Sequence, residues 1–184
     1  MPKGFKASAV SAGIKKNGKK DLSLIVSDVP AAVAGVFTRN RVQAAPVVLD
    51  KQRLAGGVCR AIIANSGNAN CATKEQGMKD ATAMTRAVSD ALDLDPQQVM
   101  GASTGVIGVP LPVDHICAAV PALVQALDAD GFGDAAEGIM TTDTRPKLVS
   151  RQGEMDGKGF EITAMAKGAG MIRPDMATML CFVC

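Results

Sequence analysis

The chain has very few aromatic side chains: among its 184 residues five are Phe, and none is Trp or Tyr. Proteins that bind single-stranded nucleic acids stack bases on aromatic rings, so this function class is disfavoured although the N-terminal segment is rich in lysine. The formal net charge of +2 is also close to balance. Hydrophobic residues make up 47% of the chain, which predicts a sizeable core of aliphatic side chains.

The chain also lacks an apolar run of about 18 residues, the length expected of a membrane-spanning helix. Its first twenty residues contain no apolar segment typical of a secretory signal. Five cysteines at irregular spacing then indicate reduced thiols and a cytoplasmic location. Cys181 and Cys184 form an isolated pair with no second pair to complete a metal site, and these cysteines are expected to be structural. The only histidine, His115, is given no role, and no metal site is predicted.

Hydrophobic periodicity predicts mixed α/β structure. The segment 73–93 is the clearest helix, because apolar residues recur there every three to four positions. A helical region over 113–128 is expected to be interrupted near Pro121, and 148–162 to form a hairpin. Further expectations are strands within 1–11 and at 22–26, 33–37, 47–49, 61–64 and 179–183, a loop at 65–68 and a helical turn at 134–139. Without strict βαβ alternation or a linker, the prediction is one layered α/β unit with a mixed sheet over 1–184.

Thr178 is a candidate nucleophile of the self-cleaving kind. Its hydroxyl would attack the carbonyl of Ala177, whose small side chain allows the approach, and the freed amine would then act as the base. An unperturbed terminal amine has a pKa near 7.7–8.0, so it is partly neutral at cytoplasmic pH and needs no histidine. From the residues alone, an ordinary Ala-Thr pair beside a strand remains the commoner interpretation.

The segment Ser103-Thr104-Gly105-Val106-Ile107-Gly108 is a second candidate. A threonine hydroxyl and a glycine amide at a tight turn are suitable donors to the oxyanion formed in acyl transfer. A phosphate-binding loop is disfavoured, because the segment matches neither common glycine-rich phosphate motif and no lysine follows it. A purely structural turn is also consistent with these residues.

Several short motifs resemble, in the same order, the N-terminal half of the ornithine acetyltransferase (glutamate N-acetyltransferase) family. Each is weak alone, but together they run almost from end to end of the chain. They are Gly13-Ile14-Lys15-Lys16, Gly35-Val36-Phe37-Thr38, Asn40-Arg41, Ala44-Ala45-Pro46-Val47, Asn65-Ser66-Gly67-Asn68-Ala69-Asn70, Ser103-Thr104-Gly105-Val106-Ile107-Gly108, Met140-Thr141-Thr142-Asp143-Thr144, Lys167-Gly168-Ala169-Gly170-Met171-Ile172 and Ala177-Thr178-Met179-Leu180.

This resemblance implies roles for particular residues. It places self-cleavage between Ala177 and Thr178, makes Thr178 the residue that carries the acetyl group, and assigns the oxyanion hole to Thr104 and Gly105. A lysine that matches Lys167 and an upstream threonine would contact substrate, along with Thr178. Thr142 is chosen for that threonine, while Thr141 and Thr144 fit the motif nearly as well. Without the resemblance, Lys167 would be read as a surface lysine.

The resemblance also implies the activity and the fold type. Family members transfer acetyl from N2-acetylornithine to glutamate in arginine biosynthesis, without a metal or organic cofactor. Some also use acetyl-CoA as the acetyl donor, which the residues leave open here. The implied fold is of the N-terminal-nucleophile-like type, and the active form is a heterotetramer of two alpha and two beta chains cut from one precursor, with no nucleic-acid or membrane partner.

Family precursors are about twice as long as this chain. Residues 1–177 would therefore be the alpha chain and 178–184 the start of the beta chain, and the unit is expected to be incomplete without the C-terminal half. Two alternatives to an acetyltransferase remain open: a related self-processing aminopeptidase, or an inert scaffold half of a two-chain enzyme.

Overall fold

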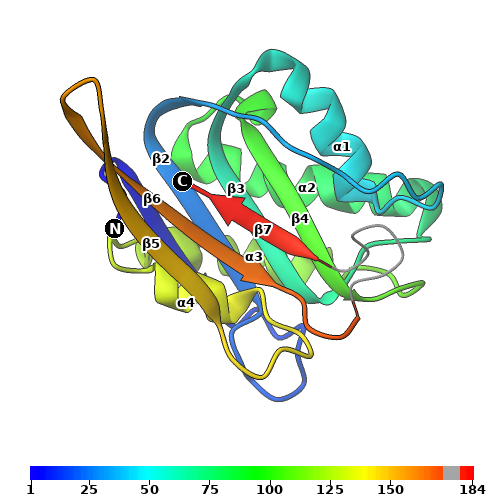
Figure 1. Ribbon diagram of the computed structural model, residues 1–184. Helices are drawn as coiled ribbons and strands as arrows, with labels where there is room; N and C mark the ends of the chain where they lie inside the picture. Colours follow the sequence, from blue (N-terminus) through cyan, green and yellow to red (C-terminus); the bar gives the residue numbers. More distant parts are fainter. Residues whose placement is uncertain (172–178) are drawn as a thin grey trace.

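The structure is a computed structural model that describes residues 1–171 and 179–184 (Figure 1). Within these residues, the larger sheet has the order β1-β2-β3-β4. The first two neighbouring pairs are antiparallel and β3-β4 is parallel, so the sheet is mixed as predicted. Its strands are β1 (Phe5–Val10), β2 (Leu22–Ala32), β3 (Val58–Asn68) and β4 (Val99–Val106).

One face of the larger sheet is covered by two amphipathic helices, α2 (Lys74–Leu92) and α3 (Val113–Gln125). Alternate residues of β2, such as Leu22 and Leu24, are buried against this layer. The side-chain period of a strand is two, so the intervening Ile25 is buried on the opposite face, against a second cluster. The sheet therefore has a core on each side, and both cores are aliphatic apart from Phe132 and a few partly buried aromatic rings.

The second face of this sheet is covered by α4 (Phe132–Gly138) and by a smaller antiparallel sheet of order β5-β6-β7. The smaller sheet lies over the larger one in Figure 1. Its strands are β5 (Lys147–Met155), β6 (Lys158–Lys167) and β7 (Leu180–Val183). Asp156 and Gly157 form the β5–β6 turn with positive φ at both residues, which confirms the predicted hairpin.

Four sequence predictions of local structure are wrong. One of them, the loop at 65–68, concerns the end of β3. Residues 47–49 lie in a helix, α1 (Ala45–Arg53), because Pro46 occupies its first turn and basic residues occupy its last. Residues 33–37 are irregular, since β2 ends where its pairing with Val58 ends. Helix α3 continues through Pro121, and the burial of Ile116 and Leu123 on either side of the proline outweighs the lost hydrogen bond.

Two short 3₁₀ helices, η1 (Leu54–Gly56) and η2 (Pro96–Gln98), complete the described elements. In this part of the chain, no helix combines the length and the hydropathy needed to cross a bilayer. Nor do the described residues bring three His, Cys, Asp or Glu side chains together as metal ligands. The five cysteines are all free thiols.

Candidate active site

The parallel strands β3 and β4 end at the same edge of the larger sheet, and this edge carries the predicted oxyanion segment. Thr104 lies opposite Ser66, and Gly105 lies opposite Gly67. The register shifts at Asn68, so residues 65–68 form the irregular end of a strand. The predicted loop there is therefore wrong: pairing with β4 keeps the asparagine-rich segment within the sheet.

Glycine is required at both members of the Gly67–Gly105 pair. Their φ angles are +107° and +138°, which lie in the region that L side chains rarely adopt. A Cβ atom on Gly105 would lie 2.3 Å from the carbonyl carbon of Gly67 and 2.5 Å from the backbone nitrogen of Asn68. The two backbones thus meet closely, and this contact fixes the position of the adjoining Thr104.

Buried asparagines connect this edge of the sheet to the neighbouring segments by hydrogen bonds. Asn65 is fully buried; its Nδ2 donates to the carbonyl of Asn68 at 2.9 Å, and its Oδ1 accepts from the hydroxyl of Ser103 at 2.6 Å. Asn68 in turn donates through Nδ2 to the carbonyls of Val109 and Pro110. The asparagine motif therefore stabilises this edge of the sheet, because its amides form hydrogen bonds with buried backbone groups of the strand ends and of the loop that follows β4.

Lys167, the last residue of β6, lies against this edge. Its Nζ donates a hydrogen bond to Oγ1 of Thr104 at 3.1 Å, and the two residues are only 3% and 2% exposed. The structure thus brings together two predicted site residues that are 63 positions apart in the sequence. The alternative of a surface lysine is wrong, since β6 pairs within the smaller sheet and directs this side chain toward the larger one.

Asp143 holds the end of β6 in place, and no role was predicted for it. Its side chain is fully buried and accepts hydrogen bonds from the backbone N–H of Gly168 at 2.8 Å, that of Thr141 at 3.3 Å, and Nζ of Lys147 at 2.5 Å. Burial alone would raise the pKa of Asp143, but these hydrogen bonds lower it to about 2. The residue was visible within the Thr-rich motif, yet nothing in the sequence indicates these partners.

The charge of Lys167 is set by its surroundings. Burial lowers the pKa of its ammonium group, the negative charge of Asp143 raises it, and the positive charge of Lys147 lowers it further. Because a desolvated cation is stabilised by a nearby anion, Asp143 favours the protonated form of Lys167. The site therefore contains a buried lysine whose protonated form is favoured by a nearby buried carboxylate.

Thr104, Gly105 and Lys167 line a cavity of about 480 Å³ between the two sheets. Thr141 and Thr142 both line it, whereas Thr144 is not among its lining residues. Among the described residues, the lining contains two lysines and no carboxylate. The full lining is Lys15, Asn17, Gly67, Thr104, Gly105, Val106, Thr141, Thr142, Lys167, Gly168, Ala169 and Met171. The cavity is thus suited to a small anionic molecule near a hydroxyl group.

The predicted cleavage residues Ala177 and Thr178 lie outside the described residues. The described chain resumes at Met179, and Leu180 is the cross-strand partner of Lys167. Met171, the last described residue before this segment, lines the cavity. The described residues on both sides of the predicted nucleophile are therefore at the site.

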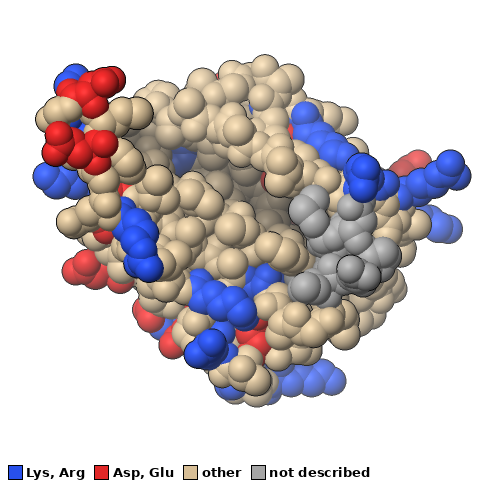
Figure 2. Space-filling model, in the orientation of Figure 1, with Lys and Arg blue, Asp and Glu red and all other residues tan. Residues whose placement is uncertain are grey.

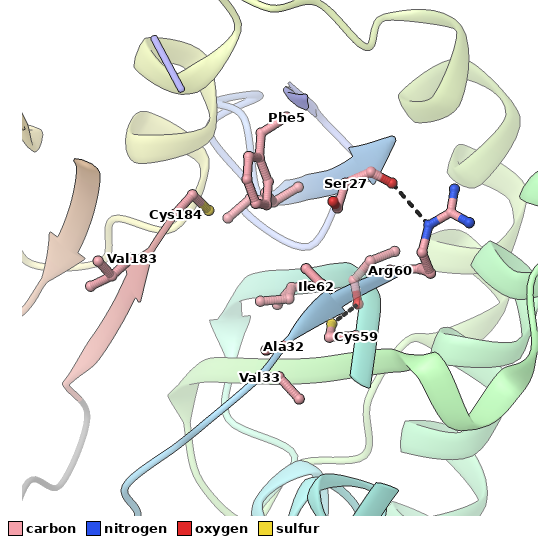
Figure 3. Close-up of a pocket in the computed structure, with 12 residues that line it drawn as sticks. Phe5, Ser27, Ala32, Val33, Cys59, Arg60, Ile62, Val183 and Cys184 are labelled. Atoms are coloured by element: carbon pink, nitrogen blue, oxygen red, sulfur yellow. Dashed lines mark hydrogen bonds between the residues drawn. The ribbon is translucent and has the colours of Figure 1, made fainter. Parts of the chain in front are cut away.

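A smaller cavity of about 80 Å³ lies between the larger sheet and the end of β7, lined among others by Phe5, Cys59, Arg60, Val183 and Cys184 (Figure 3). Burial raises the pKa of both thiols to about 11. The thiolate is the reactive form of cysteine, so these protonated groups are unsuited to nucleophilic chemistry. The interpretation of Cys184 as a structural residue agrees with this.

Comparison with known proteins identifies close relatives of the whole chain. A model of the ArgJ family matches residues 6–184. The arginine biosynthesis bifunctional protein ArgJ of Geobacter sulfurreducens is 53% identical over 181 residues, 98% of this chain and 46% of the relative. The protein of the same name from Symbiobacterium thermophilum is 54% identical over 184 residues, 99% of this chain and 46% of the relative. The chain thus spans about half the length of these curated relatives.

Two crystal structures share the fold. One is the arginine biosynthesis bifunctional protein ArgJ of Bacillus halodurans, with a TM-score of 0.90 and 39% identity, covering 96% of this chain and 92% of that chain. The other is an ornithine acetyltransferase of Mycobacterium tuberculosis complexed with ornithine, with a TM-score of 0.90 and 42% identity, covering 96% and 94%. These similarities confirm the layered α/β prediction and the recognised family.

Proposed function

The chain belongs to the ArgJ family, and we propose that it is the N-terminal part of an acetyltransferase that moves acetyl from N2-acetylornithine to glutamate. The observation that carries this proposal is the hydrogen bond between Lys167 and Thr104 at a cavity that Thr142 also lines. It joins the predicted carboxylate-binding group and the predicted oxyanion donor at one place. The similarity to the Mycobacterium tuberculosis ornithine acetyltransferase, whose structure is complexed with ornithine, supports the same substrate class.

In the proposed reaction, the precursor first cleaves itself at Ala177–Thr178. The freed amine of Thr178 then accepts the proton of its hydroxyl, and the hydroxyl oxygen attacks the acetyl carbon of N2-acetylornithine. Ornithine leaves with a proton on its nitrogen, and the acetyl group remains on Thr178 as an ester. The amino group of glutamate attacks this ester, which gives N-acetylglutamate and regenerates the hydroxyl.

Thr104 and Gly105 would stabilise the tetrahedral intermediates of both steps. The described geometry supports this role for Thr104, because its Oγ1 accepts a hydrogen bond from Lys167. The hydroxyl proton of Thr104 is then directed elsewhere and can be donated to an oxyanion in the cavity. Lys167 thus orients the donor as well as supplying positive charge.

Lys167 and Thr142 would hold the α-carboxylate that N2-acetylornithine and glutamate share. A compact ammonium group suits a carboxylate, and the low exposure of Lys167 strengthens the attraction by excluding water. One lysine can serve both half-reactions because the two amino acids occupy the site in turn. The proposed reaction uses no metal or organic cofactor.

A second chain from the same precursor is the proposed partner, in a heterotetramer of two alpha and two beta chains in the cytoplasm. The outer face of the smaller sheet supports a partner, because several of its large apolar side chains are exposed. Four of them are 43–63% exposed: Val149, Phe160, Ile162 and Val183. Few charged side chains lie over the middle of the face shown in Figure 2. Contiguous apolar surface of this kind marks interaction sites.

The test uses the full-length protein. Incubation with N2-acetylornithine and glutamate should yield N-acetylglutamate, and mass measurement should find two chains that meet at Ala177–Thr178. Thr178→Ala should give one uncut chain and no acetyl transfer. Hydrolysis of short peptides without acetyl transfer would favour the aminopeptidase alternative. Absence of both activities in the cleaved wild-type protein would favour the scaffold alternative.

A further inference from the structure

The loop between β1 and β2 brings a second lysine to the cavity. Lys15 and Asn17 both line it, although they lie some 150 positions before Lys167 in the sequence. Neither residue has a role in the function proposed above. The loop carries the Gly-Ile-Lys-Lys motif, one of the segments on which the family resemblance rests.

A buried carboxylate fixes the position of this loop. Asp21 is 0% exposed; its Oδ1 accepts the backbone N–H of Ala12 at 2.6 Å, and its Oδ2 accepts that of Lys15 at 2.8 Å. The stem of Lys15 also packs near Gly67, where an added Cβ would lie 3.4 Å from Cγ of Lys15 and 2.9 Å from Cγ2 of Ile14. Lys15 is therefore a half-buried side chain of defined position at the same edge as Thr104.

The Lys15 ammonium group retains capacity to bind an anion. Its Nζ donates to the carbonyl of Lys20 at 2.8 Å, which uses one of its three N–H groups. Burial lowers the pKa of Lys15, Asp21 raises it, and the charges of Lys19 and Lys167 lower it. Lys15 and Lys167 therefore repel each other across a cavity whose described lining contains no carboxylate. A ligand that carries two negative charges would reduce this repulsion.

We infer that Lys15, with Asn17 beside it, forms a subsite for the distal carboxylate of a dicarboxylic amino acid whose α-carboxylate is held by Lys167. This inference rests on the proposed function and names the substrate class of that site. N2-acetylornithine and glutamate share the α-carboxylate, but their side chains carry opposite charges. Lys15 attracts the carboxylate side chain and repels the ammonium side chain. Lys15 thus selects the acceptor rather than the donor.

Asn17 is suited to the same ligand. Its Oδ1 accepts the backbone N–H of Lys19 at 3.2 Å, so its oxygen faces its own loop. The Nδ2 group of the same carboxamide is then the end that can donate to a carboxylate. A lysine and an asparagine amide together supply a positive charge and a directed hydrogen-bond donor for a carboxylate.

The test compares glutamate with norvaline, in which a methyl group replaces the distal carboxylate, by calorimetric titration of the full-length protein. Lys15→Met keeps most of the apolar stem and removes the charge. It should weaken glutamate binding by roughly tenfold to a hundredfold, as expected for one charge of a partly desolvated pair, and change norvaline binding by less than about twofold. Lys16→Met, which alters an exposed neighbour that does not line the cavity, should leave both affinities unchanged. Lys15→Arg should restore part of the preference for glutamate.

Equal weakening of both ligands by Lys15→Met would make Lys15 a support of the loop and overturn the subsite. Unchanged glutamate binding would overturn it as well. Acetyl transfer is measured separately on the same variants: in Lys15→Met, KM for glutamate should rise, whereas KM for N2-acetylornithine should not rise and should fall if the repulsion of its ammonium group is relieved. If the wild-type protein transfers no acetyl but the selective loss of glutamate binding is found, the proposed function fails and the subsite stands.

Discussion

Asp143 accepts a hydrogen bond from the backbone N–H of Gly168, at 2.8 Å, and so connects the segment after α4 to the end of β6. Gly168 directly follows Lys167, and the negative charge of Asp143 also raises the pKa of that lysine. One buried carboxylate therefore sets both the position and the protonation of the proposed substrate-binding cation. We regard Asp143 as a positioning residue, since it is not among the residues that line the cavity.

Replacing Asp143 should weaken binding of both substrates. In the full-length enzyme, Asp143→Ala leaves the N–H of Gly168 without its acceptor, a cost of about 1–3 kcal/mol, and removes the counter-charge of Lys167. KM for N2-acetylornithine and for glutamate should rise together, with a smaller change in kcat. Because the pKa of Lys167 falls further, binding should also be lost at a lower pH than in the wild type.

Lys147→Met is the matched control for this prediction. It removes the ion pair between Lys147 and Asp143, in which the lysine side chain is 41% exposed, and leaves the Asp143–Gly168 hydrogen bond. Solvent screens the exposed lysine end of this pair and limits its contribution to about 1 kcal/mol, so KM should change by no more than about fivefold. If both variants raised KM equally, the ion pair rather than the bond to Gly168 would carry the effect.

The charge of Lys167 should be essential to the reaction. Lys167→Met keeps most of the stem but leaves the substrate carboxylate unpaired in a desolvated site, which costs about 2–5 kcal/mol. The value of kcat/KM should therefore fall by roughly 30-fold to several thousand-fold in the full-length enzyme. A loss of less than about fivefold, with self-cleavage intact, would remove Lys167 from the substrate-binding group.

Thr104 should act on the transition state. Thr104→Ala removes the hydroxyl donor and should lower kcat by roughly 10²–10³, with a modest change in KM. Thr104→Ser retains the hydroxyl and should recover most of the rate. A change in KM with kcat preserved would place Thr104 among the binding residues and eliminate its role as oxyanion donor.

Gly105 should not tolerate even a methyl group. Gly105→Ala combines a φ of +138° with contacts of 2.3–2.6 Å between the new Cβ and the backbone of residues 67 and 68. Gly108→Ala is the matched control, because its φ is also positive, at +81°, but no atom lies within 4 Å of the added Cβ. The control should lose about 1–3 kcal/mol of stability from backbone strain.

Thermal unfolding of the full-length protein measures the difference between the two glycine variants. Gly105→Ala should be clearly less stable than Gly108→Ala, since backbone atoms must shift to accommodate it. Equal melting temperatures would show that the β3 and β4 ends separate easily, contrary to the close contact described above.

Asp50 should make stability depend on pH near neutrality. Burial raises the pKa of its carboxyl group from 3.8 to about 7, against the opposing effects of the hydrogen bond from Gly101 and the charge of Arg53. The native state thus binds the proton more tightly than the unfolded state. The stabilisation is complete below about pH 4 and is lost as the pH rises to about 7, by ~4 kcal/mol at most.

Asp50→Asn keeps an acceptor for the N–H of Gly101 and removes the titration. Urea unfolding at intervals from pH 4 to pH 8 should show a shallower decline in the free energy of unfolding for the variant than for the wild type. An unchanged slope would mean that Asp50 is ionised in the native state throughout this range.

Much of the fold could be predicted from periodicity. Helix α2 and the β5–β6 hairpin have long, regular patterns with clear turn signals, and both predictions are confirmed. The short apolar segment at 47–49 was read as a strand because three residues do not distinguish a strand from a helix, and Pro46 decided for the helix. The continuation of α3 through Pro121 depended on burial against the sheet, which no local signal reveals.

The sequence by itself determined which residue types are present in the motifs, and the resemblance they carry identified Thr104, Gly105, Thr142 and Lys167 as site candidates. Tertiary structure decided how the described candidates meet, since Lys167 reaches Thr104 only through the pairing of β6 in a sheet that lies over β4. It also gave roles to two residues for which the motifs predicted none: Asp143 accepts the N–H of Gly168, and Lys15 lines the cavity. The physical reason is that hydrogen bonds, desolvation and charge interactions depend on distances between residues far apart in the chain, and only the packing of the two sheets sets those distances.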